Sequence, residues 1–256
     1  MRVVANIGGY LFVPLVQLNI WQEKCKVFTH DHGIKGTLVL SHEGVNIMLA
    51  GEQRAITTFV SWFKNFPEFK TIQFKYARSD FVPFKRMLVK IKPFLVPGLL
   101  PLTNRDKGLN LTPYELKCWY EKSQDFVLID VRNEYEIAWG KFENAINMHL
   151  HEFKNFETAL SNINPTVKEK KVVFYCTGGI RCEKAVPVAK KAGFKYVYQL
   201  EGGILNYFKE YKGAYYQGDC YVFDERQALT SELEPIKKDV HTFFSVFVCA
   251  QDKRIS

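Results

Sequence analysis

The 256-residue sequence lacks the patterns that mark several classes of protein. Its six cysteines form no C-x-x-C pair and no H-x₃₋₅-H partner accompanies them, so we expect no metal site. Unpaired cysteines in a chain too long to need disulfide bonds favour a reducing, cytoplasmic location. No run of 18 apolar residues occurs, so we expect no transmembrane helix and no membrane partner. The cysteines stand at positions 25, 118, 176, 182, 220 and 249.

Negative charge is scarce in the first 100 residues. They hold 13 Lys and Arg against 6 Asp and Glu, a net charge of +7. Residues 101–256 hold 22 against 21, a net charge of +1, and the two parts sum to the formal charge of +8. Such asymmetry predicts either a polyanionic partner or an ordinary solvated surface, and charge alone does not separate the two.

The N-terminal hundred residues alternate between strand and helix patterns. The order β-α-β-β-α-β with one added strand predicts a ferredoxin-like α+β domain over residues 1–92. Because this fold hosts many functions, it says little about activity by itself. We expect strands over 3–13, 37–40, 45–49, 70–76 and 87–91, and helices over 15–29 and 53–65.

Proline and glycine are frequent between Lys92 and Leu111, which predicts a linker over residues 93–111. Thr112 and Pro113 then form a typical helix start. After it, short apolar strands alternate with helices, so we expect a parallel-sheet α/β domain over 112–215. Residues 216–256 form a C-terminal extension of unassigned structure. The expected strands span 126–129, 171–175 and 196–198, and the helices 182–192 and 204–211.

The segment from Cys176 to Arg181 carries the strongest chemical signal. It joins a buried strand to a helix through Thr177, Gly178, Gly179 and Ile180. The two glycines allow successive N–H groups to point inward as an anion-binding nest, and the following helix adds its partial positive charge. We therefore predict that Cys176 is a nucleophile with a lowered pKa, and that Arg181 holds an anionic adduct or substrate.

Three supporting residues are expected beside this loop. Asp130, which ends a neighbouring strand, and Arg132 either brace the loop as a pair, which we favour, or present Arg132 to the substrate. Cys182 follows Cys176 by six residues. It either resolves an oxidised Cys176 or packs as a small residue at the helix start. We favour packing, because a helical turn tends to point the two sulfurs apart.

A basic segment precedes the linker. Residues 64–92 hold eight Lys or Arg against Glu68 and Asp80, with aromatic residues interleaved. This mixture suits phosphate contacts and base stacking, although a strand with aromatics inside and lysines outside gives the same pattern. We assign Lys85 and Arg86 as the RNA-binding candidates.

The C-x₄-R spacing of Cys176 and Arg181 resembles that of the rhodanese sulfurtransferases. A wider set of segments resembles the tRNA uridine hydroxylase family, which places an acylphosphatase-like domain before a rhodanese domain. The resemblance covers about residues 1–228, and the family's paired tail cysteines are absent here. The segments that carry it are 33–37, 43–46, 83–86, 130–136, 176–184, 200–205 and 221–226.

The resemblance implies an enzyme that performs oxygen-dependent 5-hydroxylation of the wobble uridine in tRNA. It implies that the loop cysteine passes through a persulfide and that molecular oxygen is a co-substrate. With the charge asymmetry, we expect that the N-terminal domain recognises tRNA. The sequence shows no evident cofactor motif. A sulfur donor, either a protein or a small thiol, is a further expected partner.

Two other functions stay open from the sequence. A plain sulfurtransferase would move sulfane sulfur from thiosulfate or a protein persulfide through Cys176 to an acceptor. A non-enzymatic rhodanese-like binding module is the third hypothesis. Cys176 argues against it, because inactive rhodanese domains commonly lose the nucleophile.

Overall fold

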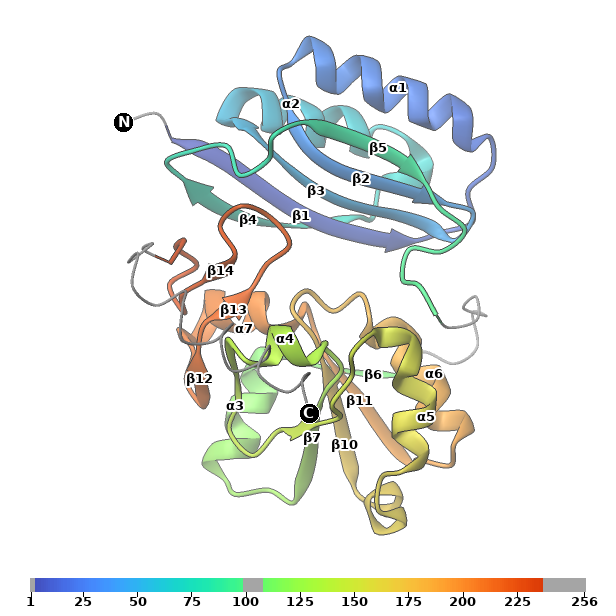
Figure 1. Ribbon diagram of the computed structural model, residues 1–256, viewed down its shortest axis with the longest axis vertical. Helices are drawn as coiled ribbons and strands as arrows, with labels where there is room; N and C mark the ends of the chain where they lie inside the picture. Colours follow the sequence, from blue (N-terminus) through green and yellow to red (C-terminus); the bar gives the residue numbers. More distant parts are fainter. Residues whose placement is uncertain (1–2, 99–107, 237–256) are drawn as a thin grey trace, which may run out of the picture.

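The computed structural model describes residues 3–98 and 108–236, which form two domains stacked one above the other (Figure 1). Of the predicted C-terminal extension, residues 237–256, which include Cys249, lie outside the described residues. Within the described ranges, none of the helices is both long and apolar enough to cross a bilayer.

The N-terminal domain is a five-stranded sheet with helices on one face (Figure 1). The strand order is β4-β1-β3-β2-β5, antiparallel except for the parallel pair β2 and β5. The observed element order confirms the predicted ferredoxin-like arrangement. The elements are β1 (Val4–Phe12), α1 (Leu18–Asp31), β2 (Lys35–Ser41), β3 (Gly44–Glu52), α2 (Gln53–Lys64), β4 (Gln73–Ser79) and β5 (Met87–Ile91).

Two predicted starts in this domain are wrong. The helix expected from residue 15 begins at Leu18. The strand expected from residue 70 begins at Gln73, because Pro67–Phe69 forms a short 3-10 helix that turns the chain first. Proline favours such a turn, since its fixed φ suits a helix start and it has no N–H to give a strand ladder.

The two faces of strand β1 have different neighbours. Ala5 and Ile7 point into the core beneath α1 and α2, where Trp21 and Phe59 also pack. Strand side chains alternate between faces, so the residues between them point the other way. That second face of the sheet turns toward the second domain (Figure 1).

The second domain is built on a five-stranded parallel sheet in the order β6-β11-β10-β7-β9. Strand β6 was predicted to be linker; it pairs instead with β11 as an edge strand. The elements are β6 (Leu109–Leu111), α3 (Pro113–Glu121), β7 (Phe126–Asp130), α4 (Glu134–Ile137), β8 (Gly140–Phe142), β9 (Ile146–Asn147), α5 (Phe156–Ser161), β10 (Lys171–Tyr175), α6 (Cys182–Lys191), β11 (Tyr196–Leu200) and α7 (Gly203–Tyr211).

Helices cover both faces of this sheet, as the apolar strands predict. Helices α5 and α6 contribute Phe156 and Val186 to the core on one face. Helices α3 and α7 contribute Leu116 and Tyr207 to the core on the other. The predicted helix start at Thr112 is confirmed as a capping box at the N-terminus of α3.

The first part of the C-terminal extension belongs to the domain structure. Strand β12 (Tyr216–Gly218) pairs with β8, and β13 (Cys220–Tyr221) pairs with β14 (Ala228–Leu229). The loop between β13 and β14 reaches the N-terminal domain, where the Glu225 N–H donates to the Pro83 carbonyl at 3.1 Å. The extension therefore helps to hold the two domains together.

Candidate active site

Cys176 lies at the carboxyl end of β10, where open α/β sheets bind ligands. It is 2% exposed, and its sulfur accepts the Gly179 N–H at 3.1 Å. The start of α7 closes the loop from the other side, since the Ile204 N–H donates to the Cys176 carbonyl at 3.0 Å. A Cβ on Gly203 would lie 2.3 Å from that carbonyl oxygen, so only glycine allows this approach.

Opposing effects set the pKa of Cys176. Burial raises it, but a hydrogen bond from the Cys182 thiol, the charge of Arg181 and the backbone N–H groups of Arg181 and Gly179 together lower it to about 6. The thiol of Cys182 stays protonated, because burial and the neighbouring Cys176 raise its pKa well above the ordinary value. The two thiols therefore act on one another's pKa, and the choice between packing and resolution as the role of Cys182 stays a prediction.

Arg181 is held by a carboxylate. Its guanidinium donates to Glu136 at 2.8 and 3.1 Å, in a bidentate pair with a fully buried side chain. Glu136 also caps α4 by accepting the Asn133 N–H at 3.0 Å. Arg181 was predicted to hold an anionic ligand. In the structure such a ligand would share the Arg181 guanidinium with Glu136, a residue for which no role was predicted.

Asp130 and Arg132 form a buried ion pair. The Arg132 Nη2 donates to Asp130 at 2.7 Å and to the Gly140 carbonyl at 2.6 Å, and neither residue has an exposed surface. Because its donors are engaged with protein groups, Arg132 stays away from the cavity described below. This geometry matches a brace between β7 and β8.

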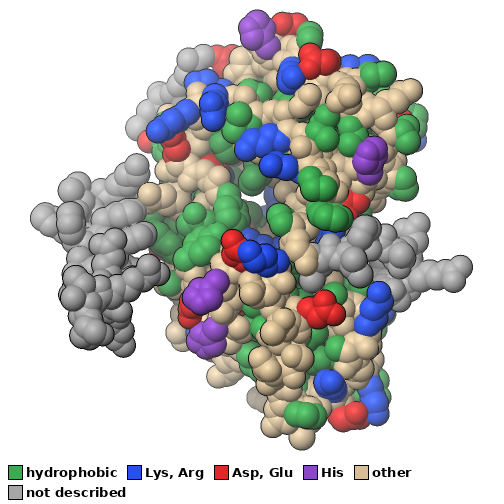
Figure 2. All heavy atoms as spheres, turned by 45° about the vertical axis from the view of Figure 1, so that its right-hand side comes forward, with side chains coloured by type: hydrophobic (Ala, Val, Ile, Leu, Met, Phe, Trp, Pro, Cys, Tyr) green, Lys and Arg blue, Asp and Glu red, His purple; other side chains and the backbone are tan. Residues whose placement is uncertain are grey.

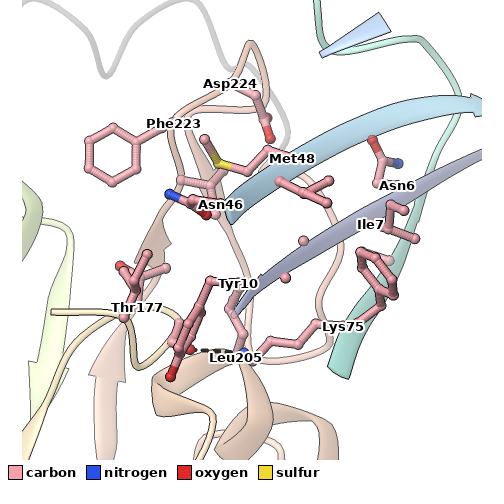
Figure 3. Close-up of a pocket in the computed structure, with 18 of the residues that line it drawn as sticks. Asn6, Ile7, Tyr10, Asn46, Met48, Lys75, Thr177, Leu205, Phe223 and Asp224 are labelled. Carbon is pink, nitrogen blue, oxygen red and sulfur yellow. Dashed lines mark hydrogen bonds between the residues drawn. The ribbon is translucent and has the colours of Figure 1, made fainter. Parts of the chain in front are cut away.

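Two side chains of the N-terminal domain contact the cysteine loop (Figure 3). Neither was predicted as a site residue. Lys75 on β4 donates to the Gly178 carbonyl at 2.8 Å. Tyr10 on β1 donates to Glu183 at 3.3 Å, and its hydroxyl lies against Gly179, where a Cβ would come within 2.9 Å of it. Burial lowers the pKa of Lys75 and raises that of Tyr10.

A second contact across the domain interface is an ion pair. Lys184, which is 1% exposed, donates to Glu43 at 2.8 Å, and the other oxygen of Glu43 accepts the Leu95 N–H at 2.6 Å. Glu43 lies in the tight turn between β2 and β3, and Lys184 lies on the first turn of α6. The helix that begins behind the cysteine loop is thereby tied to the N-terminal sheet.

A cavity of about 610 Å³ separates the domains beside Cys176. Figure 2 shows the surface hollowed between the upper and lower halves of the molecule. Its walls come from β1, β3 and β4 above and from the cysteine loop, α7 and the β13–β14 loop below. Predicted loop residues that line it are Cys176, Thr177, Gly178, Ile180 and Arg181.

Lys85 and Arg86 lie on the loop before β5 and are exposed to solvent. The Lys85 side chain is 90% exposed, with its Nζ 4.0 Å from Glu225. Lys75, from the same basic segment, points inward instead.

Among the described residues, no group of three or more His, Cys, Asp or Glu side chains is arranged to hold a metal ion.

Comparison with known proteins supports both domains. Residues 4–94 match the model of the UPF0176 acylphosphatase-like domain, and residues 112–210 match that of the rhodanese-like domain. A protein of Cupriavidus taiwanensis named tRNA uridine(34) hydroxylase is 40% identical over 91% of this chain and 85% of its own length. A Burkholderia vietnamiensis protein of the same name is 37% identical over 91% of this chain and 86% of its own length.

A rhodanese-like domain of known structure matches part of the chain. The solution structure of a rhodanese-like domain from Anabaena is 23% identical, with a TM-score of 0.37, and the match covers 44% of this chain and 80% of that one. The family matches confirm the predicted acylphosphatase-like domain followed by a rhodanese domain.

Proposed function

This chain belongs to the tRNA uridine(34) hydroxylase family, and we propose on that premise that it hydroxylates the wobble uridine of tRNA at C5 with Cys176 as the essential residue. The observation that carries the role of Cys176 is its place in the interdomain cavity, with a pKa of about 6. At neutral pH such a cysteine is mostly thiolate, the form that reacts. Two domains are needed to build this site.

The cavity supports a nucleotide as substrate. Its volume of about 610 Å³ falls within the range of about 300–1,000 Å³ usual for small-molecule sites. Enzymes that modify a base inside RNA take the nucleotide out of its stack and enclose it. The exposed Lys85 and Arg86 on the N-terminal domain give the surrounding surface positive charge for tRNA phosphates.

We further propose that molecular oxygen supplies the new hydroxyl oxygen and that Cys176 works through a persulfide. A sulfane-sulfur donor, either a protein persulfide or a small-molecule persulfide, would load the cysteine: the Cys176 thiolate attacks the donor's outer sulfur, and the donor leaves as its thiolate. Support comes from the family membership and from the Gly179 N–H and the Arg181 charge, which stabilise an anionic terminal sulfur as they stabilise the thiolate. Action on tRNA places the proposed activity in the cytoplasm.

The experiment compares tRNA nucleosides from a strain that lacks the gene and carries either the wild-type or the Cys176→Ser protein. We expect 5-hydroxyuridine derivatives with the wild-type protein and none with Cys176→Ser, because a serine hydroxyl does not ionise near neutral pH. Cys118→Ser, on the half-buried face of α3, is the matched control and should retain full modification. Full modification by Cys176→Ser would refute the role of Cys176.

Sulfur transfer is the second candidate, favoured by the match to the rhodanese-like domain. Purified protein mixed with thiosulfate and a small thiophilic acceptor should then turn over, and peptide mass spectrometry should find a reducible extra sulfur on Cys176. Turnover without any effect of gene deletion on tRNA nucleosides would favour this function over hydroxylation.

A further inference from the structure

On the face of strand β1 that lines the cavity, one position has no side chain and leaves a gap in the wall. Asn6, Gly8 and Tyr10 alternate on that face, and all three line the cavity. Gly8 has no positive φ, and a Cβ there would meet only the Ile47 carbonyl oxygen, at 4.0 Å. The backbone therefore does not require glycine at this position. A glycine inside a strand often marks a place where a ligand comes close.

A buried acceptor lies next to this gap. Asn6 is 3% exposed, and its Nδ2 donates to Ser79 Oγ at 2.8 Å. The Ser79 hydroxyl donates its own hydrogen to the Phe81 carbonyl at 2.6 Å, which fixes the orientation of the Asn6 amide. Asn6 Oδ1 is left without a hydrogen-bond partner among the described residues. Figure 3 shows this residue at one end of the cavity wall.

A buried donor lines the same cavity from the β13–β14 loop. Arg226 is 9% exposed, and its Nε donates to Asp224 at 2.8 Å. Its Nη2 also bonds Asp224, whereas Nη1 has no partner in the part of the chain that the structure describes. Buried polar atoms without partners are rare, because each gives up its bond to water. One acceptor and one donor of this kind point to a polar ligand with the complementary groups.

We propose that the cavity wall formed by Asn6, Gly8 and Arg226 binds the uracil base of the target nucleotide, an assignment that rests on the proposed function for the identity of that nucleotide. The open space above Gly8 receives the base. Asn6 Oδ1 accepts the N3–H of uracil, and Arg226 Nη1 donates to a neighbouring base carbonyl. Both atoms are buried in the free protein, so binding in this way requires the Asn6 amide to turn from its Ser79-bound orientation and the Arg226 guanidinium to turn toward the base.

This arrangement selects uracil over cytosine. The N3 atom of cytosine carries no hydrogen and is an acceptor, so it would face Asn6 Oδ1 acceptor to acceptor. When the wrong ligand binds, a buried polar group of the site is left without a hydrogen bond, so the site discriminates strongly against that ligand. Cys176 lines the same cavity, so a base bound in this way shares the compartment of the thiolate.

The test measures binding of anticodon stem-loop RNAs that carry uridine, cytidine or an abasic nucleotide at the wobble position. The wild-type protein should bind the uridine RNA about tenfold more tightly than the abasic RNA. Gly8→Val fills the gap with a residue that strands accept, and it should bind both RNAs alike. The matched control is Gly51→Ala in β3, where a Cβ makes ordinary contacts no closer than 3.6 Å, and it should keep the tenfold difference.

A second variant tests the hydrogen bond to the base. Asn6→Ala should reduce the preference for uridine over cytidine RNA severalfold, and this ratio does not move when a variant merely destabilises the domain. An unchanged ratio, or a Gly8→Val protein that still prefers the uridine RNA over the abasic one, would overturn the proposal. If the wild-type protein shows these preferences but does not hydroxylate tRNA, the proposed activity fails while the uracil site stands.

Discussion

The thiolate of Cys176 should depend measurably on Cys182. The pKa of Cys176 falls from an ordinary 9.0 to about 6 although burial opposes ionisation, and the Cys182 hydrogen bond is the first of the groups that lower it. A hydrogen bond to a charged group contributes about 1.5–3 kcal/mol. Since one pKa unit corresponds to 1.36 kcal/mol, Cys182→Ala should raise the pKa of Cys176 by about 1–2 units.

The assay follows the rate of iodoacetamide alkylation against pH, with mass spectrometry of the peptide that contains Cys176. In the wild-type protein the rate should rise with a midpoint near pH 6, and in Cys182→Ala with a midpoint about 1–2 units higher. Cys220→Ser is the control, because Cys220 is also a buried thiol but is not one of the groups named above that lower the pKa of Cys176. A wild-type midpoint at or above 9.0 would contradict the loop geometry, and an unshifted midpoint in Cys182→Ala would contradict the sulfur–sulfur hydrogen bond.

The same pKa has a consequence for stability. The folded pKa of about 6 lies below the unfolded value of 9.0, so the unfolded chain binds the extra proton between these pH values. Ionisation of Cys176 therefore stabilises the fold as pH rises from about 6 to 9, by about 4 kcal/mol in all, and this contribution is lost as pH falls through 6. Urea unfolding at pH 6 and pH 9 should show a smaller increase in stability for Cys176→Ala than for the wild type.

Three further predictions follow from charged contacts. Neutralising Lys85 and Arg86 together should weaken binding of all tRNAs alike and flatten its salt dependence, and an unchanged salt slope would mean that these residues are only a solvated surface. Lys184→Met leaves the carboxylate of Glu43 without its partner at the domain interface, so chemical unfolding should show a loss of about 3–5 kcal/mol. Glu136→Gln removes the charge that holds the loop arginine, so kcat for tRNA should fall at least about tenfold with little change in the tRNA dissociation constant.

The cysteine loop could be predicted because its chemistry is local. The six residues 176–181 between a buried strand and a helix fix where Cys176 lies, and the glycines at 178 and 179 allow the tight turn of the backbone around it. The parallel sheet follows from strands that alternate with helices, and it brings Asp130 to the same edge. The ferredoxin-like order follows from periodicity in the same way.

The interdomain contacts could not be predicted, because no local pattern specifies how two domains dock. Lys75 was indistinguishable in sequence from the exposed lysines around it, yet it donates to the cysteine loop from 103 residues away. Glu43 and Lys184 are similarly distant, at 141 residues. The influence of Cys182 on the pKa of Cys176 was also not predicted, because side-chain direction on the first turn of a helix depends on the loop that enters it.

Docking of the N-terminal sheet has two opposite effects on the reactive cysteine. Excluding water raises the pKa of Cys176, but the same exclusion strengthens every charge and N–H group that faces the sulfur. Lys75 holds the Gly178 carbonyl outward, so the N–H groups of the loop remain directed at the sulfur. The second domain thus supplies the nucleophile and the first supplies the environment in which its thiolate is stable. We infer from this division that neither domain alone would reproduce the activity, even though each has its own hydrophobic core.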